Sequence, residues 1–279
     1  MTRKQKQKLS KVILEILMII LAIIFIYPIF LMFINSVKPF GEVVADVIAL
    51  PTKIEWQNYK DVIDKMNYPR LFTNNLVITI IGILGIIAFS AITAYILDRR
   101  RTRYTRIAHL IITTPMLIPF QTIMITLLKV MNVINLSGST WGLGIQYWGF
   151  GIPMATFIYC NFMQTIPKEL DESAVIDGAS TFRTFRSVIF PLLKSVTATI
   201  VVLDVMWIWN DFLLPLLMVN SSPATKTLVL SAYAFVGQFN TQWHYAMTAM
   251  VLAVLPSIIF FILLQRYIVD GVVAGAVKG

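Results

Sequence analysis

The sequence contains little of what soluble enzymes use to build metal sites, disulfides or phosphate sites. It has one cysteine, Cys160, which lies in an apolar run and has no partner for an intrachain disulfide. Its two histidines, His109 and His244, have no partners at the spacing of metal ligands. No Gly-x4-Gly-Lys-Ser/Thr phosphate loop occurs, and no Ser/His, paired-Asp or His-Glu-x-x-His arrangement. We therefore expect no metal site, no catalytic residues and no ATP hydrolysis on this chain.

Charge is also scarce. Charged residues make up 13% of the chain, against roughly 25% in soluble domains. The net charge of +9 would suit nucleic acid, but the basic residues stand in short clusters beside apolar runs. That pattern is typical of membrane topology signals and argues against nucleic acid as a partner.

Apolar residues, in contrast, are abundant. They make up 57% of the chain, and a membrane-spanning helix needs roughly 20 consecutive, predominantly apolar residues. The sequence therefore predicts an all-α polytopic membrane bundle of six transmembrane helices, forming one domain over residues 1–279. The six windows are about 12–34, 75–97, 107–130, 147–166, 196–219 and 246–268. The start of the fourth window is interrupted by Gly149, Gly151 and Pro153.

The basic clusters predict the orientation of this bundle. The N-terminal tail has five basic residues before its first acid, Glu15. The loop after the second window has five arginines and one acid, Asp98. Because short loops rich in Lys and Arg stay in the cytoplasm, both termini are predicted to be cytoplasmic. The polar segment 167–194, between the fourth and fifth windows, is then cytoplasmic as well.

Segment 167–194 is long and strongly patterned for a connector between two spans. Acidic residues crowd the start of its first half, where negative charge complements a helix dipole. We expect Gly178 to end that helix in a left-handed conformation and Ser180 to cap a second helix. A solvated connector is the alternative, but two aromatic side chains need either the bundle or a partner to cover them. The apolar face expected on the second helix comprises Phe182, Phe185 and Ile189.

The same segment resembles a known signature. Glu172-Ser173-Ala174, three residues, Gly178, nine residues and then Val188-Ile189-Phe190-Pro191 is similar to the EAA signature of importer permeases. These are the membrane subunits of binding-protein-dependent ATP-binding-cassette importers. Further stretches resemble the smaller permease of oligosaccharide importers of the maltose-transporter type: Asn35 to Pro39, Trp209-Asn210-Asp211-Phe212 and the ending 265–279.

The resemblance implies partners and site residues. A cytosolic ATPase dimer, carrying ATP and Mg, would bind segment 167–194, and no cofactor is expected on this chain. A second permease subunit would share the translocation path through the bacterial inner membrane. An external binding protein would deliver a sugar to this path. The residues implied in ATPase coupling are Glu172, Ser173, Ala174, Asp177, Gly178, Phe182, Phe185 and Pro191.

The fifth window supplies candidates for the substrate path, because aromatic rings stack on sugars and polar groups bond their hydroxyls. The candidates are Trp207, Trp209, Asn210 and Asp211. An aromatic belt at the membrane interface is the alternative. Intramembrane acids, here Asp204 and Asp211, would also suit a proton-coupled secondary transporter. An importer of the same class for a non-sugar solute such as a polyamine is the other open alternative.

Overall fold

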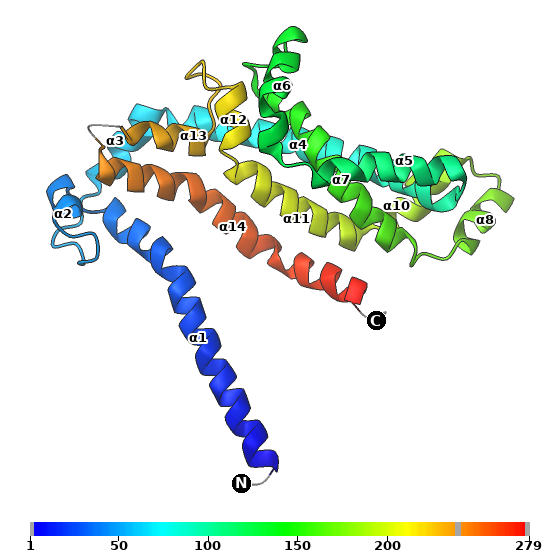
Figure 1. Ribbon diagram of the computed structural model, residues 1–279, viewed down its shortest axis with the longest axis horizontal. Helices are drawn as coiled ribbons and strands as arrows, with labels where there is room; N and C mark the ends of the chain where they lie inside the picture. The colour runs from blue at the N-terminus through cyan, green and yellow to red at the C-terminus, as the bar shows by residue number, and fades with distance from the viewer. Residues whose placement is uncertain (1–2, 238–240, 277–279) are drawn as a thin grey trace. The chain divides into compact units, whose positions relative to one another are not determined.

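The computed structural model describes residues 3–237 and 241–276, and every regular element in these ranges is helical (Figure 1). The prediction of an all-α fold is therefore confirmed. The last residues of the ending at 265–279 lie outside the described residues. The helices divide between two compact units. Unit 1 comprises Met1–Tyr68 and Ser231–Ala253, and unit 2 comprises Pro69–Leu230 and Val254–Gly279.

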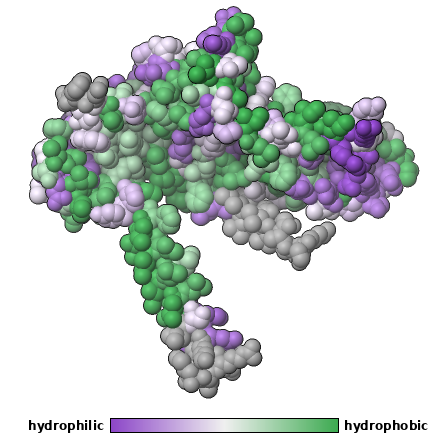
Figure 2. Space-filling view, viewed as in Figure 1, coloured by the Kyte–Doolittle hydropathy of each residue, from purple (hydrophilic) through white to green (hydrophobic). Residues whose placement is uncertain are grey.

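Unit 1 contains α1 (Arg3–Ser36), α2 (Phe40–Ala45), α3 (Gln57–Met66), η3 (Tyr233–Phe235) and the start of α14 (Trp243–Ala276). The last carbonyl of α1, that of Ser36, has no hydrogen-bond partner within the helix, and bonds from other elements hold this end in place. The Ser36 carbonyl accepts a hydrogen bond from Thr248 Oγ1 at 2.8 Å and another from Asn58 Nδ2 at 3.0 Å. The apolar side chains of α1 between Val12 and Phe30 are exposed, as the green surface in Figure 2 shows, which suits contact with lipid.

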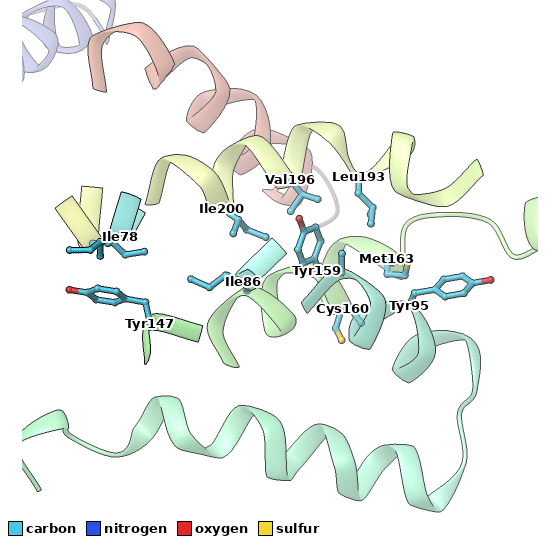
Figure 3. Close-up of a cluster of buried hydrophobic side chains, with 14 of the residues drawn as sticks. Ile78, Ile86, Tyr95, Tyr147, Tyr159, Cys160, Met163, Leu193, Val196 and Ile200 are labelled. Atoms are coloured by element: carbon cyan, nitrogen blue, oxygen red, sulfur yellow. The ribbon is translucent and has the colours of Figure 1, made fainter. Parts of the chain in front are cut away.

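Unit 2 is built around α4, α7 and α11, whose buried side chains form its core (Figure 3). Helix α13 (Leu228–Ala232) lies where the two units meet in sequence. The other elements, in chain order, are α4 (Tyr68–Arg99), α5 (Arg103–Thr113), η1 (Thr114–Leu117), α6 (Phe120–Val133), α7 (Thr140–Met163), α8 (Glu169–Ile176), α9 (Thr181–Thr184), η2 (Phe185–Ile189), α10 (Phe190–Leu192), α11 (Lys194–Asn210) and α12 (Leu213–Met218).

Glycines let α4 and α7 approach closely. The Trp148 ring lies over Gly85, where an added Cβ would stand 2.0 Å from the ring, and its Nε1 donates to the Ile81 carbonyl at 2.8 Å. An added Cβ on Gly151 would stand 2.3 Å from the side chain of Ile86. Small residues at a helix interface are the usual means of close packing in membranes, where lipid supplies no hydrophobic driving force.

Only part of the six predicted spans is found as unbroken helix. Unbroken candidate spans lie at Ser10–Ser36, Tyr68–Arg99 and Trp243–Gln265, and two bent helix pairs raise the number in the described residues to five at most. The window 107–130 bends by 103° between η1 and α6. Pro119 explains the break, because it lacks a backbone donor and its ψ of 132° is not helical.

The window 196–219 is also divided. Helix α11 ends at Asn210, Asp211 is extended with a ψ of 139°, and α12 begins at Leu213. The window 147–166 lies largely within α7, which has Pro153 in its interior and is not among the candidate spans. The count of six spans and the cytoplasmic position of both termini therefore stay predictions.

Candidate coupling loop and transport path

Segment 167–194, hereafter the coupling loop, folds as two short helical pieces joined at a glycine. Helix α8 starts at Glu169, two residues after Pro167, and ends before Gly178, whose φ of 79° is left-handed. The Gly178 amide donates to the Val175 carbonyl at 3.0 Å, and the next amide donates to the Ala174 carbonyl at 2.9 Å. These bonds satisfy the last carbonyls of α8, so Gly178 ends the helix as expected.

The second piece runs through α9, η2 and α10. Ser180 caps it as expected, since its Oγ accepts a hydrogen bond from the Arg183 amide. Within it, η2 is a π-helical turn in which the Phe190 amide donates to the Phe185 carbonyl five residues back. Pro191 follows directly and has no amide to donate, which favours such a turn. Pro191 lies in the first turn of α10.

The apolar face that the sequence predicts is covered only in part. Phe185 and Ile189 are buried in the core of unit 2, and the Phe185 ring lies 5.3 Å from the Tyr95 ring, between centroids. Phe182, in contrast, is 64% exposed. Two of the three residues of the predicted apolar face thus lie in the core of the bundle, and the part of this face in ATPase coupling stays a prediction. The bundle covers Phe185 and leaves Phe182 open.

The tip of the coupling loop carries an exposed apolar surface bordered by acids. Val175 is 61% exposed and Ile176 is 85% exposed, whereas Ala174 in the same helix is buried. Among the residues implied in ATPase coupling, the exposed ones are Glu172, Ser173, Asp177, Gly178, Phe182 and Pro191.

A mostly buried ion pair holds the loop to the end of α4. Asp171 Oδ2 lies 2.9 Å from Arg99 Nε, and its other oxygen accepts a hydrogen bond from the Tyr95 hydroxyl at 2.7 Å. Arg99 also donates to the Ile166 carbonyl and pairs with Asp98 at 2.8 Å. Sequence reasoning missed this network, because it treats the arginines after the second span only as topology signals. Their single acid neighbour, Asp98, was the available hint of a structural role.

The four path candidates of the fifth window do not form one site. Trp209 is fully buried and packs edgewise on Phe72 and Phe260. Asn210 donates to the Met206 carbonyl and accepts from Ser257 Oγ. Asp211 accepts a hydrogen bond from the Tyr147 hydroxyl at 2.9 Å. Trp207 is the most exposed of the four, at 40%.

In the part of the chain that the structure describes, no group of three or more His, Cys, Asp or Glu side chains could hold a metal ion. Apolar helices joined by an exposed polar loop define a polytopic membrane protein. Residues 86–273, which include the coupling loop, match the family described as binding-protein-dependent transport system inner membrane component. The chain belongs to this family and is thus an integral protein of the bacterial inner membrane.

Several relatives match over nearly their whole length. The probable starch degradation products transport system permease protein AmyC of Thermoanaerobacterium thermosulfurigenes is 39% identical, covering 98% of this chain and 99% of its own. The multiple sugar-binding transport system permease protein MsmG of Streptococcus mutans is 30% identical, covering 99% and 100%. The melibiose/raffinose/stachyose import permease protein MelC of Bacillus subtilis is 30% identical, covering 96% of each.

A solved structure shares the fold. It is a bacterial ABC transporter involved in the import of the acidic polysaccharide alginate, and one of its chains superposes with a TM-score of 0.81. The match covers 96% of this chain and 98% of the other, at 22% identity.

Proposed function

We propose that this chain is a permease subunit of an ATP-driven importer for a sugar or oligosaccharide. With a second permease it forms the translocation path for a solute that an external binding protein delivers. The energy enters from a cytosolic ATPase dimer through the coupling loop. The observation that carries this proposal is the exposed, rigidly capped loop in a chain of this transport family.

The sugar cargo is supported by the relatives. The names of AmyC, MsmG and MelC all refer to sugars or starch products, and each relative aligns over nearly the whole of both chains. A screen of the cognate binding protein against sugars and polyamines tests the cargo. Tight binding of a polyamine and of no sugar would favour the non-sugar importer.

The ATPase contact is supported by the surface of the coupling loop. Ile176 and Phe182 expose large apolar side chains that a partner would cover, and the carboxylates of Glu172 and Asp177 lie exposed in the same loop. A matching surface on the ATPase would be an apolar groove with basic residues at its edge. The chain has no phosphate loop of its own, so ATP-driven transport requires such a partner.

Cysteine crosslinking tests this contact. In a Cys160→Ser background, we expect Ile176→Cys and Phe182→Cys to crosslink to the ATPase in active transporter. The control is Val133→Cys, since Val133 is equally open to solvent at the end of α6 but lies outside the loop. An active transporter in which neither loop cysteine reacts with the ATPase contradicts the assignment.

Uptake measurements test the energy source. We expect Glu172→Lys to abolish uptake while the chain stays in the membrane, because a basic residue would then face the proposed basic groove. ATP depletion is expected to stop wild-type uptake. Uptake that survives ATP depletion and collapses with the proton gradient would favour the secondary transporter. Labelling of terminal cysteines from the cytoplasmic side tests the six-span topology.

A further inference from the structure

Unit 2 contains a cavity of about 470 Å³ beside the break between η1 and α6. Helix η1 and the start of α6 form one wall, the glycine-rich part of α7 forms another, and α11 forms the third. A volume of this size is within the range of small-molecule sites. The lining includes Pro115, Ile118, Gly151, Pro153, Asp204 and Trp207.

Asp204 is the charged residue among the described residues that line this cavity. Its Oδ2 atom is buried and has no hydrogen-bond partner among the described residues. A buried carboxylate oxygen without a donor is costly, and an acid inside a membrane segment is a functional hypothesis by default. The neighbouring acid of the same window, Asp211, accepts hydrogen bonds from Tyr147 and from the Leu213 amide. Of these two acids, Asp204 is the one with an oxygen open to donors from a ligand.

Trp207 stands three residues after Asp204 on α11, so both side chains project from the same side of the helix. Its ring packs edgewise on the Tyr147 ring, with centroids 5.3 Å apart and planes at 87°. That contact fixes the orientation of a ring that still exposes 40% of its surface. A fixed aromatic surface next to a carboxylate acceptor suits a sugar, which presents an apolar face of C–H groups and a rim of hydroxyl donors.

The helix break at the cavity supports a solute site. Transporters commonly place their substrate sites where transmembrane helices are discontinuous, since irregular backbone is tolerated where it lines a cavity. Here the 103° bend between η1 and α6 lines the same space as the glycine-rich part of α7, which is a continuous helix. Packing alone would not require a membrane window to be broken beside an acid whose Oδ2 has no partner among the described residues.

Given the proposed import of sugars, on which the assignment rests, we infer that this cavity is the sugar subsite that this subunit contributes. Asp204 accepts hydrogen bonds from sugar hydroxyls, and Trp207 stacks on the apolar face of the ring. Trp207 is one of the four path candidates that the sequence favours, and Asp204 lies about one turn before it on α11. An acyl chain of a lipid or a side chain of the second permease could fill the apolar walls, but neither supplies several hydroxyl donors to Asp204.

The test uses the complete transporter in proteoliposomes, with its second permease, ATPase and binding protein. Starch-hydrolysate oligosaccharides, raffinose and melibiose serve as probes, and the sugar that the binding protein retains is carried forward. We expect Asp204→Leu and Trp207→Leu to lower uptake at least tenfold. The ATPase activity stimulated by the loaded binding protein should stay within about twofold, because that step does not require the sugar contact.

Conservative variants separate binding from folding. Asp204→Asn keeps the shape and loses the charge, so its uptake should fall about threefold or more, and Trp207→Phe should retain most of it. Trp243→Phe is the control, because Trp243 is 42% exposed and lies outside the cavity. A diazirine derivative of the transported sugar should label residues 203–207 in the wild-type chain.

Two results overturn the assignment. One is a wild-type transporter that imports sugar while Asp204→Asn and Trp207→Leu import at the wild-type rate. The other is photolabelling that misses residues 203–207 in an active complex. A wild-type transporter that imports none of the sugars but takes up another solute instead contradicts the proposed function itself.

Discussion

Arg99 at the end of α4 and Asp171 in the first turn of α8 form a mostly buried ion pair, with 2.9 Å between Nε and Oδ2. The pair links the second predicted span directly to the coupling loop. The Tyr95 hydroxyl donates to the same carboxylate, one turn earlier on α4. A displacement of α8 by the ATPase would therefore act on α4 through hydrogen-bonded side chains as well as through the chain itself.

Reversing one charge of this pair should detach the loop. Removing one partner of a buried ion pair costs about 3 kcal/mol or more, because the other charge is left without compensation. We expect Asp171→Arg to lower sugar uptake at least tenfold and to speed amide hydrogen exchange in α8. The double variant with Arg99→Asp should restore part of the uptake, limited by repulsion from the neighbouring Asp98.

Arg103→Asp provides the control, since Arg103 lies in the same basic loop and is exposed. It should leave the exchange of α8 unchanged. If Asp171→Arg alone also leaves the exchange of α8 unchanged, the ion pair does not hold the loop.

The left-handed glycine of the coupling loop gives a second prediction. A side chain at Gly178, whose φ is 79°, costs roughly 1–2 kcal/mol. Gly178→Ala should therefore reduce uptake moderately. Gly178→Pro should abolish it while the chain stays in the membrane, since proline fixes φ near −65° and removes the amide that bonds Val175.

Gly138 offers a matched control for this strain. Its φ is 77°, and an added Cβ would meet nothing within 4 Å, as at Gly178. Gly138→Ala should lower thermal stability by a similar amount with little effect on coupling. Equal losses of ATP-driven uptake in the two alanine variants would show that Gly178 has no special part in coupling.

The contrast between Gly178 and Arg99 shows what the sequence can predict. The glycine cap and the Ser180 cap depend on neighbours within a few residues, so local pattern is enough to find them. The partner of Arg99 lies 72 residues away, and no local rule joins the two. The burial of Phe185 against Tyr95 likewise depends on a residue distant in sequence, which no local pattern shows. In the fifth window, residue types suggested Trp209, but tertiary packing buries it.

The close approach of α4 and α7 predicts a large effect of a small substitution. At Gly85 an added Cβ would overlap the Trp148 ring, which is held by its bond to the Ile81 carbonyl and cannot move freely. Overpacking of this kind costs typically 1–3 kcal/mol. Gly85→Ala should lower the unfolding temperature in detergent by several degrees. The control Gly41→Ala, where nothing lies within 4 Å of an added Cβ, should not. An unchanged unfolding temperature for Gly85→Ala would mean that the helices separate at little cost.

Asp61 on α3 gives a prediction for pH. Its carboxylate accepts hydrogen bonds from the Tyr245 hydroxyl at 2.6 Å and from Gln57 Nε2 at 2.6 Å, and these bonds lower its pKa below the usual 3.8. A carboxyl whose folded pKa is lowered stabilises the fold above its unfolded pKa, and that contribution is lost as the pH falls through the folded value.

Protection of α3 against hydrogen exchange should therefore be constant from neutral pH down to about pH 5 and should fall below about pH 4. Asp61→Asn should weaken protection at neutral pH and remove this acid-dependent step, because an amide does not titrate. Asp64→Asn is the matched control, since Asp64 is exposed on the same helix. The role of the Asp61–Tyr245 bond would be contradicted if α3 lost the same amount of protection between neutral pH and pH 3 in the wild-type protein and in Asp61→Asn. Corrected exchange rates at each pH, compared between the three proteins, measure the difference.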